Sequence, residues 1–109
     1  MDGRLPAIAD QLLLIERELR ALAMWEEQPP SDEALASQEP FCVDTLELEQ
    51  WLQWIFLPRM KLIIESGADL PHASGIRSIA EVVYANESER MLALFEALGE
   101  FDRLIGEAP

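Results

Sequence analysis

One stretch of this chain restricts its fold more than any other, the segment Thr45–Glu65 with the sequence TLELEQWLQWIFLPRMKLIIE. Within it, ten of the fourteen residues from 51 to 64 are apolar, and the exceptions are Gln53, Pro58, Arg59 and Lys61. A helix that is apolar on nearly all sides is stable in water only when other elements cover it. The segment therefore predicts a central helix that the rest of the chain surrounds.

This helix has predictable ends and one predictable irregularity. Asp44 with Glu47 has the spacing of a capping box at its start, and Thr45 is the alternative cap. Gly67 is placed to end the helix in the left-handed conformation. Pro58 lacks the N–H that would bond to the carbonyl four residues earlier. The helix is therefore expected to bend or break near Ile55 to Pro58.

Arg59 has an unusual position on the central helix. At 100° per residue, it lies in the middle of a face formed by five apolar residues, Leu48, Leu52, Ile55, Leu62 and Ile63. An unpaired buried charge costs on the order of several kcal/mol, so we predict a buried or half-buried ion pair. The candidate partners are Asp44, Glu81 and Asp102. Two alternatives stay open. In one, the bend exposes the guanidinium of Arg59 to water while the aliphatic part of the side chain lies on apolar surface. In the other, Arg59 binds a ligand.

Apolar residues spaced three and four apart predict further helices on both sides of the central one. They cover residues 6–25, residues 74–84, and a last helix opened by a capping box of Asn86 and Glu89. The first and last helices are long and have matching periods, so both are expected to flank the central helix. Residues 1–109 are thus predicted to form one all-α domain, a four-helix up-and-down bundle with a Pro-kinked, hydrophobic central helix.

A long polar loop, about residues 26–43, joins the first helix to the central one. Pro29 and Pro30 prevent the first helix from continuing into it. Ser31 is placed to cap one short helical turn. The end of the loop is expected to be anchored to the core by three residues, Phe41, Cys42 and Val43.

The charge balance excludes one class of function. The net charge is −13, from 21 acidic and 8 basic residues. Affinity for a phosphate backbone comes from clustered Lys and Arg, so direct nucleic-acid binding is not expected. The acidic residues serve either solubility or docking on a basic protein.

Cysteine usage and hydropathy predict the compartment. A single cysteine, Cys42, permits no intrachain disulfide, which is typical of a reducing compartment. The apolar run is about 14 residues long, shorter than the ~20 that cross a bilayer, and it contains two basic residues. The first residues carry acids where a secretion signal has basic and apolar ones. A cytoplasmic protein without membrane attachment is therefore expected.

The sequence contains no recognisable catalytic or metal-binding motif. Its one histidine, His72, lies in a proline-containing turn, and no Gly-rich phosphate loop, nucleophile elbow or Glu-x-x-His pattern is present. We therefore predict no enzymatic activity, no cofactor and no metal. The three tryptophans, Trp25, Trp51 and Trp54, are either all core residues, or Trp54 on the most polar flank of the central helix and Trp25 at the mouth of the loop form a partly exposed rim. Such a rim is typical of protein-binding patches.

The run PFCVDTLELEQWLQWIFLPRMKLI resembles the signature of the YqcC-like family of small bacterial proteins. The matching residues are Pro40–Phe41, Asp44–Thr45, Trp51–Trp54 and Pro58–Met60. The chain departs from the family at Leu48, where proline is usual, and around residues 73–80, where aromatic residues are common. The resemblance implies an all-helical fold without established catalytic residues. It also implies association with a TruC-type tRNA pseudouridine synthase, whose gene commonly lies beside the family's and whose catalytic motif is missing here.

Three functional hypotheses follow from these observations. The first is an accessory protein, monomer or homodimer, that binds a protein partner such as this synthase through its acidic surface and its tryptophans. The second is an acidic mimic of nucleic acid that blocks a basic groove. The third is a small-molecule site beside Arg59 and Pro58. The residues singled out for interaction or structure are Trp25, Trp51, Trp54, Arg59 and Asp44.

Overall fold

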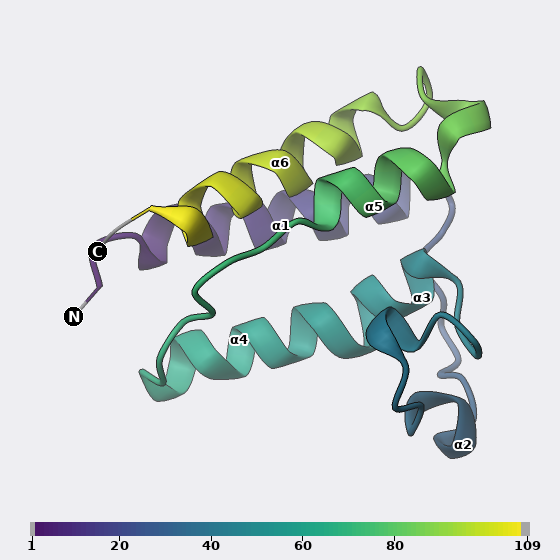
Figure 1. Cartoon of the computed structure of the whole chain (residues 1–109), viewed down its shortest axis with the longest axis horizontal. Helices are drawn as coiled ribbons and strands as arrows, with labels where there is room; N and C mark the ends of the chain where they lie inside the picture. Colours follow the sequence, from purple (N-terminus) through teal and green to yellow (C-terminus); the bar gives the residue numbers. More distant parts are fainter. Residues whose placement is uncertain (1, 108–109) are drawn as a thin grey trace.

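The computed structural model describes residues 2–107, and within this range it contains helices and no strand. The main elements are α1 (Leu5–Ala21), a central helix made of α3 (Leu48–Trp51), η2 (Leu52–Phe56) and α4 (Leu57–Ser66), then α5 (Ile76–Val83) and α6 (Leu92–Gly106). Shorter elements are α2 (Asp32–Leu35), η1 (Pro40–Cys42) and η3 (Ala85–Glu87). The main helices alternate in direction (Figure 1), which confirms the all-α, up-and-down four-helix bundle.

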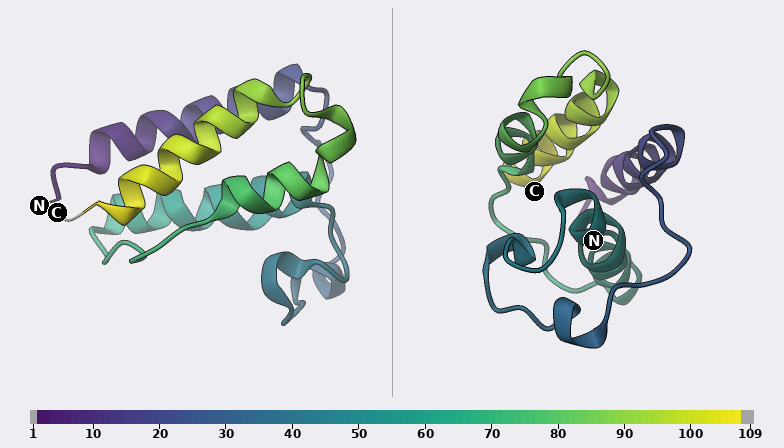
Figure 2. Two further views of the ribbon diagram at one scale, coloured as in Figure 1. Left: turned by 45° about the horizontal axis from the view of Figure 1, so that its top comes forward. Right: turned by 90° about the vertical axis from the view of Figure 1, so that its right-hand side faces the viewer.

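The core lies mainly between α1 and α6. The buried stripe of α1 consists of Ile8, Leu12, Ile15 and Leu19, and the buried face of α6 includes Leu94, Leu98, Phe101 and Ile105. The two terminal helices therefore pack chiefly against each other, and α1 also contacts α4. Helix α6 lies chiefly against α1 and α5 (Figure 2), and it reaches the central helix through the ring of Phe101, which contacts that of Phe56. The prediction that both terminal helices flank the central one is therefore correct for α1 and only partly correct for α6.

Arg4 joins the two ends of the described chain. Its Nη1 donates to the carbonyl oxygens of Leu104 at 2.9 Å and Ile105 at 3.2 Å, and to the carbonyl of Glu107. Its guanidinium also pairs with Asp2. The last carbonyls of a helix have no partner within the helix, so Arg4 caps the C-terminus of α6.

The first helix ends earlier than predicted, at Ala21 and not at Trp25. The N–H of Met24 bonds to the carbonyl of Leu19 at 2.9 Å, and the N–H of Ala23 bonds to that of Arg20 at 3.1 Å. This is the Schellman ending, which requires a left-handed residue, here Ala23 with φ 61°. Glycine usually takes this position, so the alanine gives no stop signal in the sequence.

The irregularity predicted before Pro58 is present as a widened turn, and the central helix continues through it. Over η2 the turn is one residue longer than in an α-helix, and the N–H of Leu57 bonds to the carbonyl of Leu52. The extra residue moves the apolar face by one position, so Phe56, Leu57 and Met60 are buried. The predicted face therefore does not continue as a regular count requires, although Ile63 is partly buried against the core. Leu62, placed on it by a regular count, is 65% exposed.

The start of the central helix also differs from the prediction. Its N-cap is Glu47, whose N–H donates to Gln50 Oε1 at 2.8 Å. Asp44 does not cap the helix; its carboxylate accepts from Ser37 Oγ at 2.5 Å. Thr45 instead donates its hydroxyl to a carbonyl of α2. The expected left-handed ending at Gly67 is confirmed, with φ 69°.

The loop before the central helix wraps around one end of that helix (Figure 2). Ser31 caps α2 as predicted, because its Oγ accepts from the Ala34 N–H at 3.1 Å. Phe41 packs against the core and Cys42 is buried, but Val43 is 73% exposed and does not anchor the chain. No helix within residues 2–107 is long and apolar enough to span a bilayer.

Helices α5 and α6 are held together by an acid on α6. Asp102 accepts from the backbone N–H groups of Ile76 at 3.1 Å and Arg77 at 2.9 Å, which are free donors at the start of α5. Helix α6 begins at Leu92, so the prediction that Asn86 opens it is wrong. Asn86 lies in η3, where the Glu87 N–H bonds to a carbonyl three residues back.

Tyr84 gives a prediction for the alkaline range. Its buried hydroxyl donates to Glu49 Oε1 at 2.7 Å, and burial together with this carboxylate raises the pKa of the phenol far above its usual value. The stabilisation is complete below the unfolded pKa near 10 and is lost as the pH rises above it. Tyr84→Phe is expected to cost about 1 kcal/mol at pH 7 and to flatten the fall in stability above pH 10, measured by urea unfolding. Parallel pH curves for the two proteins would contradict this.

Candidate functional site

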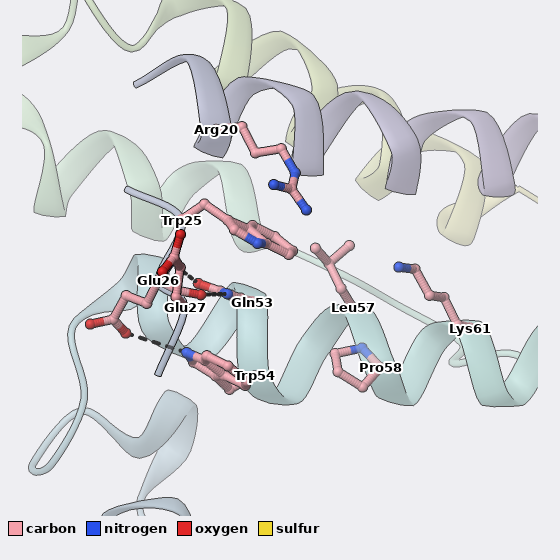
Figure 3. A pocket seen from close by; sticks show the side chains of 9 residues that line it. All are labelled: Arg20, Trp25, Glu26, Glu27, Gln53, Trp54, Leu57, Pro58 and Lys61. Carbon is pink, nitrogen blue, oxygen red and sulfur yellow. Dashed lines mark hydrogen bonds between the residues drawn. The ribbon is translucent and has the colours of Figure 1, made fainter. Parts of the chain in front are cut away.

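A large hollow lies where the end of α1 meets the central helix (Figure 3). Its volume is about 770 Å³ and it is open to solvent. The wall comes from three sources: α1, the segment after α1, and one side of η2 and α4. The lining residues are Arg20, Trp25, Glu26, Glu27, Gln53, Trp54, Leu57, Pro58 and Lys61. We call this the tryptophan hollow.

Gln53 fixes the position of the segment that follows α1. Its amide oxygen accepts from the Glu26 N–H at 2.8 Å, and its amide nitrogen donates to the Glu26 carbonyl at 2.7 Å. Gln53 is only 5% exposed, so both bonds are made largely out of water. A side-chain amide can bond to both the N–H and the carbonyl of one residue. It then supplies the two hydrogen bonds that a neighbouring β-strand would otherwise make, and so fixes a segment without regular structure.

The side chain of Glu26 holds Trp54 in place. Its Oε1 accepts from the indole Nε1–H of Trp54 at 3.3 Å and from Gln50 Nε2 at 3.2 Å. Trp54 is half-buried, so part of its ring remains on the surface of the hollow. Because Gln53 and Trp54 both belong to η2, the widened turn is the element that presents them to the same segment. Widened turns of this kind occur frequently at functional sites.

Basic residues occupy the other end of the hollow. The Arg20 guanidinium lies 4.5 Å from the centre of the half-buried Trp25 ring, a cation–π contact. Glu16 joins the two cations, lying 3.1 Å from Arg20 Nε and 3.4 Å from Lys61 Nζ. Burial opposes ionisation of Glu16, but the hydrogen bonds from both cations outweigh it and lower the pKa of this carboxyl.

The hollow therefore has two polar ends and an apolar floor. Glu26 and Glu27 lie at one end, Arg20 and Lys61 at the other, and rings of both tryptophans with Pro58 lie between them (Figure 3). The lining includes no serine, cysteine or histidine. This arrangement can stack on apolar groups and pair with charges, which are the means of binding a partner.

Comparison with known proteins decides the family. The family model DUF446, described as tRNA pseudouridine synthase C, matches residues 7–104. The chain belongs to the DUF446 family. The resemblance to YqcC is also confirmed: Escherichia coli (strain K12) YqcC is 29% identical over 97 residues, 89% of each chain. The solution NMR structure of YqcC from E. coli matches with a TM-score of 0.86 and 26% identity, covering 99% of this chain and 92% of that one.

Two further relatives bear on the function of DUF446 chains. An uncharacterised protein of Haemophilus influenzae is 40% identical over 84 residues, which are 75% of this chain and 79% of that protein. A protein of Pectobacterium carotovorum named tRNA pseudouridine synthase C is 46% identical over 66 residues, 61% of this chain. Those residues make up only 18% of the synthase, so this chain has no counterpart to most of that protein.

The third tryptophan of this DUF446 chain does not belong to the hollow. The ring of Trp51 lies 4.7 Å from that of Phe41 and 5.4 Å from that of Phe56, measured between centres. Phe56 in turn contacts Phe101 of α6 at 5.0 Å. Aromatic pairs at these distances stabilise a core beyond the area they bury. Of the three tryptophans, the structure thus brings together only Trp25 and Trp54.

Arg59 and Asp44 are not brought together, and neither lines the tryptophan hollow. Arg59 is exposed, and within residues 2–107 no carboxylate lies within 4.0 Å of its guanidinium. The predicted ion pair is therefore wrong, and the exposed alternative is right. The reason is the added residue in η2, which turns Met60 inward in its place.

The analysis of the sequence missed Gln53 and Glu26, which organise the hollow. A glutamine inside an apolar helical run was a signal, because a buried amide needs partners. The identity of its partner could not be found in the same way. Glu26 is one of several acids in a polar loop, and the bonds to Gln53 use its backbone, which every residue possesses.

Proposed function

We propose that this chain is a non-catalytic accessory domain that binds a tRNA pseudouridine synthase of the C type. The Pectobacterium relative carries this proposal. A chain with the synthase's name contains a stretch 46% identical to this one, and that stretch is 18% of its length. A small domain joined to a much larger protein of stated activity is expected to work together with it.

Charge complementarity supports the same partner. An enzyme that acts on tRNA needs Lys and Arg residues against the phosphate backbone. The present chain has a net charge of −13, and its segment 26–39 contains five acidic residues and no basic one. Opposite charges increase the rate of association and suppress wrong partners. A basic surface on the synthase is therefore a suitable partner for this chain.

The tryptophan hollow is the contact surface that we propose. Trp25 and Trp54 are half-buried and held by fixed contacts, so little entropy is lost when a partner covers them. Tryptophan is enriched at the centres of protein interfaces, where it contributes much of the binding energy. The acidic end of the hollow, Glu26 and Glu27, would receive a basic side chain of the partner.

Binding to the purified synthase tests the proposal. We expect the wild-type chain to bind the synthase of the same organism at micromolar concentration or below in low salt, with affinity that falls as salt rises. Trp54→Ala is expected to weaken binding by about tenfold or more in calorimetric titration, because truncated interface tryptophans typically cost over about 1.4 kcal/mol. Val82→Ala changes an exposed side chain on α5, away from the hollow, and is the control.

The outcomes separate the two parts of this proposal. Absence of wild-type binding at micromolar concentration in low salt would overturn the accessory role. Binding that Trp54→Ala leaves unchanged would keep the partner but remove the hollow as the contact. Circular dichroism of each variant shows whether its fold is retained.

A second function is favoured by the acidic segment 26–39. Five acids without a basic residue can occupy a groove built for phosphates, as a mimic of nucleic acid would. The mimic displaces tRNA from the synthase, whereas an accessory domain leaves tRNA bound. Measuring tRNA binding to the synthase at increasing concentrations of this chain distinguishes the two.

A further inference from the structure

A second cavity of about 270 Å³ lies between the central helix and the connection from α4 to α5. Four aromatic residues contribute to its wall, Phe41, Trp51, Phe56 and Phe101, together with Met60 and Ile63. Its one charged lining residue is Arg59. We call this the Arg59 pocket. It shares no lining residue with the tryptophan hollow.

Arg59 differs from every other basic residue of the chain. All eight basic residues lie within the described range, and seven of them have a carboxylate within 4.0 Å. With 21 acidic residues available, a cation without an acid partner is unexpected. The guanidinium is a rigid fork of donors suited to a carboxylate. Its position at an apolar pocket leaves these donors free for a ligand.

The pocket wall is maintained at a cost in backbone strain. Phe41 has φ 58° and the next residue, Cys42, has φ 49°, conformations that L-residues with side chains rarely adopt. Such a residue costs on the order of 1–3 kcal/mol, and strained residues cluster at ligand sites. The strained turn directs the Phe41 ring onto Trp51, where it closes the wall.

We propose that the Arg59 pocket binds a small carboxylic acid with an aromatic or branched apolar body. The carboxylate pairs with the Arg59 guanidinium, and the body lies against Trp51, Phe41 and Phe56. The volume restricts the ligand to a small molecule, because pockets that hold drug-sized ligands measure roughly 300–1,000 Å³. One free cation among aromatic rings suits a single carboxylate better than a nucleotide, whose several phosphates require more cations.

Indole-3-acetate is a suitable probe, with neutral indole-3-acetamide as its matched control. In ¹H–¹⁵N spectra of the full chain, the acid is expected to shift the indole N–H signal of Trp51 and the amides of Gly75 and Ile76, which line the pocket. The acetamide is expected to bind at least about tenfold more weakly, because it cannot make the charge-assisted pair. The three tryptophans give three indole signals, so the site of binding is read directly.

Arg59→Gln removes the cation from an exposed position and is expected to retain the fold while weakening indole-3-acetate about tenfold or more. Arg17→Gln removes an exposed arginine from α1, outside the pocket, and is expected to bind like the wild type. Equal binding of acid and amide, unchanged binding by Arg59→Gln, or shifts at Trp54 in place of Trp51 would each overturn the proposal. The synthase is absent from this assay, so its result is independent of the proposed accessory role.

Discussion

Met60→Asn is expected to lower the free energy of unfolding by about 4 kcal/mol, while Arg59→Asn lowers it by less than about 1 kcal/mol. Met60 is 3% exposed, so its loss removes a buried apolar side chain worth roughly 1.5–3 kcal/mol and buries an amide without partners. Arg59 is exposed, and its replacement costs about the difference in helix propensity. Domains of this size have only about 5–15 kcal/mol of stability, so Met60→Asn removes a large fraction.

Comparing Met60→Asn with Arg59→Asn tests the widened turn of η2, because the same side chain is introduced at two adjacent positions that differ in burial. Urea unfolding followed by tryptophan fluorescence measures both variants under identical conditions. A regular α-helix would place residue 59 inward and residue 60 outward, and the order of the two effects would reverse. Equal losses for the two variants would also contradict the register, because the structure buries only one of these positions.

Gln53→Ala is expected to lower the free energy of unfolding by about 3 kcal/mol and to open the tryptophan hollow. The substitution leaves the N–H and the carbonyl of Glu26 without their partners, and an unsatisfied buried polar group costs roughly 1–3 kcal/mol. The segment carrying Trp25 then loses its attachment to η2. Urea unfolding gives the stability, and a shift of the fluorescence maximum to longer wavelength reports the exposure of Trp25.

Gln28→Ala is the matched control, because Gln28 lies in the same segment and its side chain is exposed. It is expected to stay within about 0.5 kcal/mol of the wild type. If Gln53→Ala behaves like this control, the segment is held by contacts other than the amide pair. In that case the hollow would keep its shape without Gln53.

Helices marked by a regular spacing of apolar residues were predictable from the sequence. Features set by the conformation of a single turn were not. The apolar stripe of α1, the central helix and the left-handed Gly67 all follow from local patterns. The end of α1 does not, because the left-handed position after it is occupied by Ala23 and not by glycine. Pro58 indicated an irregularity in the central helix, but not that it would be a widened turn. One added residue in η2 then changed the predicted face of everything after it.

The candidate site was predictable to the same extent. The sequence indicated that Trp25 and Trp54 could lie at a rim, and the structure places both in one hollow. It predicted a pairing of Arg59 with an acid, because a regular helix would bury the guanidinium. In the structure, the guanidinium of Arg59 has no acid partner, and Arg59 lines the second pocket. Contacts made by backbone groups, such as those of Glu26, have no signature in a sequence.

The hydrogen bonds from Arg4 to the last turn of α6 affect how this bundle can be joined to other domains. These hydrogen bonds bring residue 4 next to residue 107. Figure 1 shows that the end of α1 and the start of the central helix, which contribute to the tryptophan hollow, lie toward the opposite end of the bundle. A polypeptide joined near residue 4 or residue 107 would therefore start at the end of the bundle away from the hollow. The bundle is therefore suited to being carried as a self-contained module, attached at one end and with the tryptophan hollow toward the other.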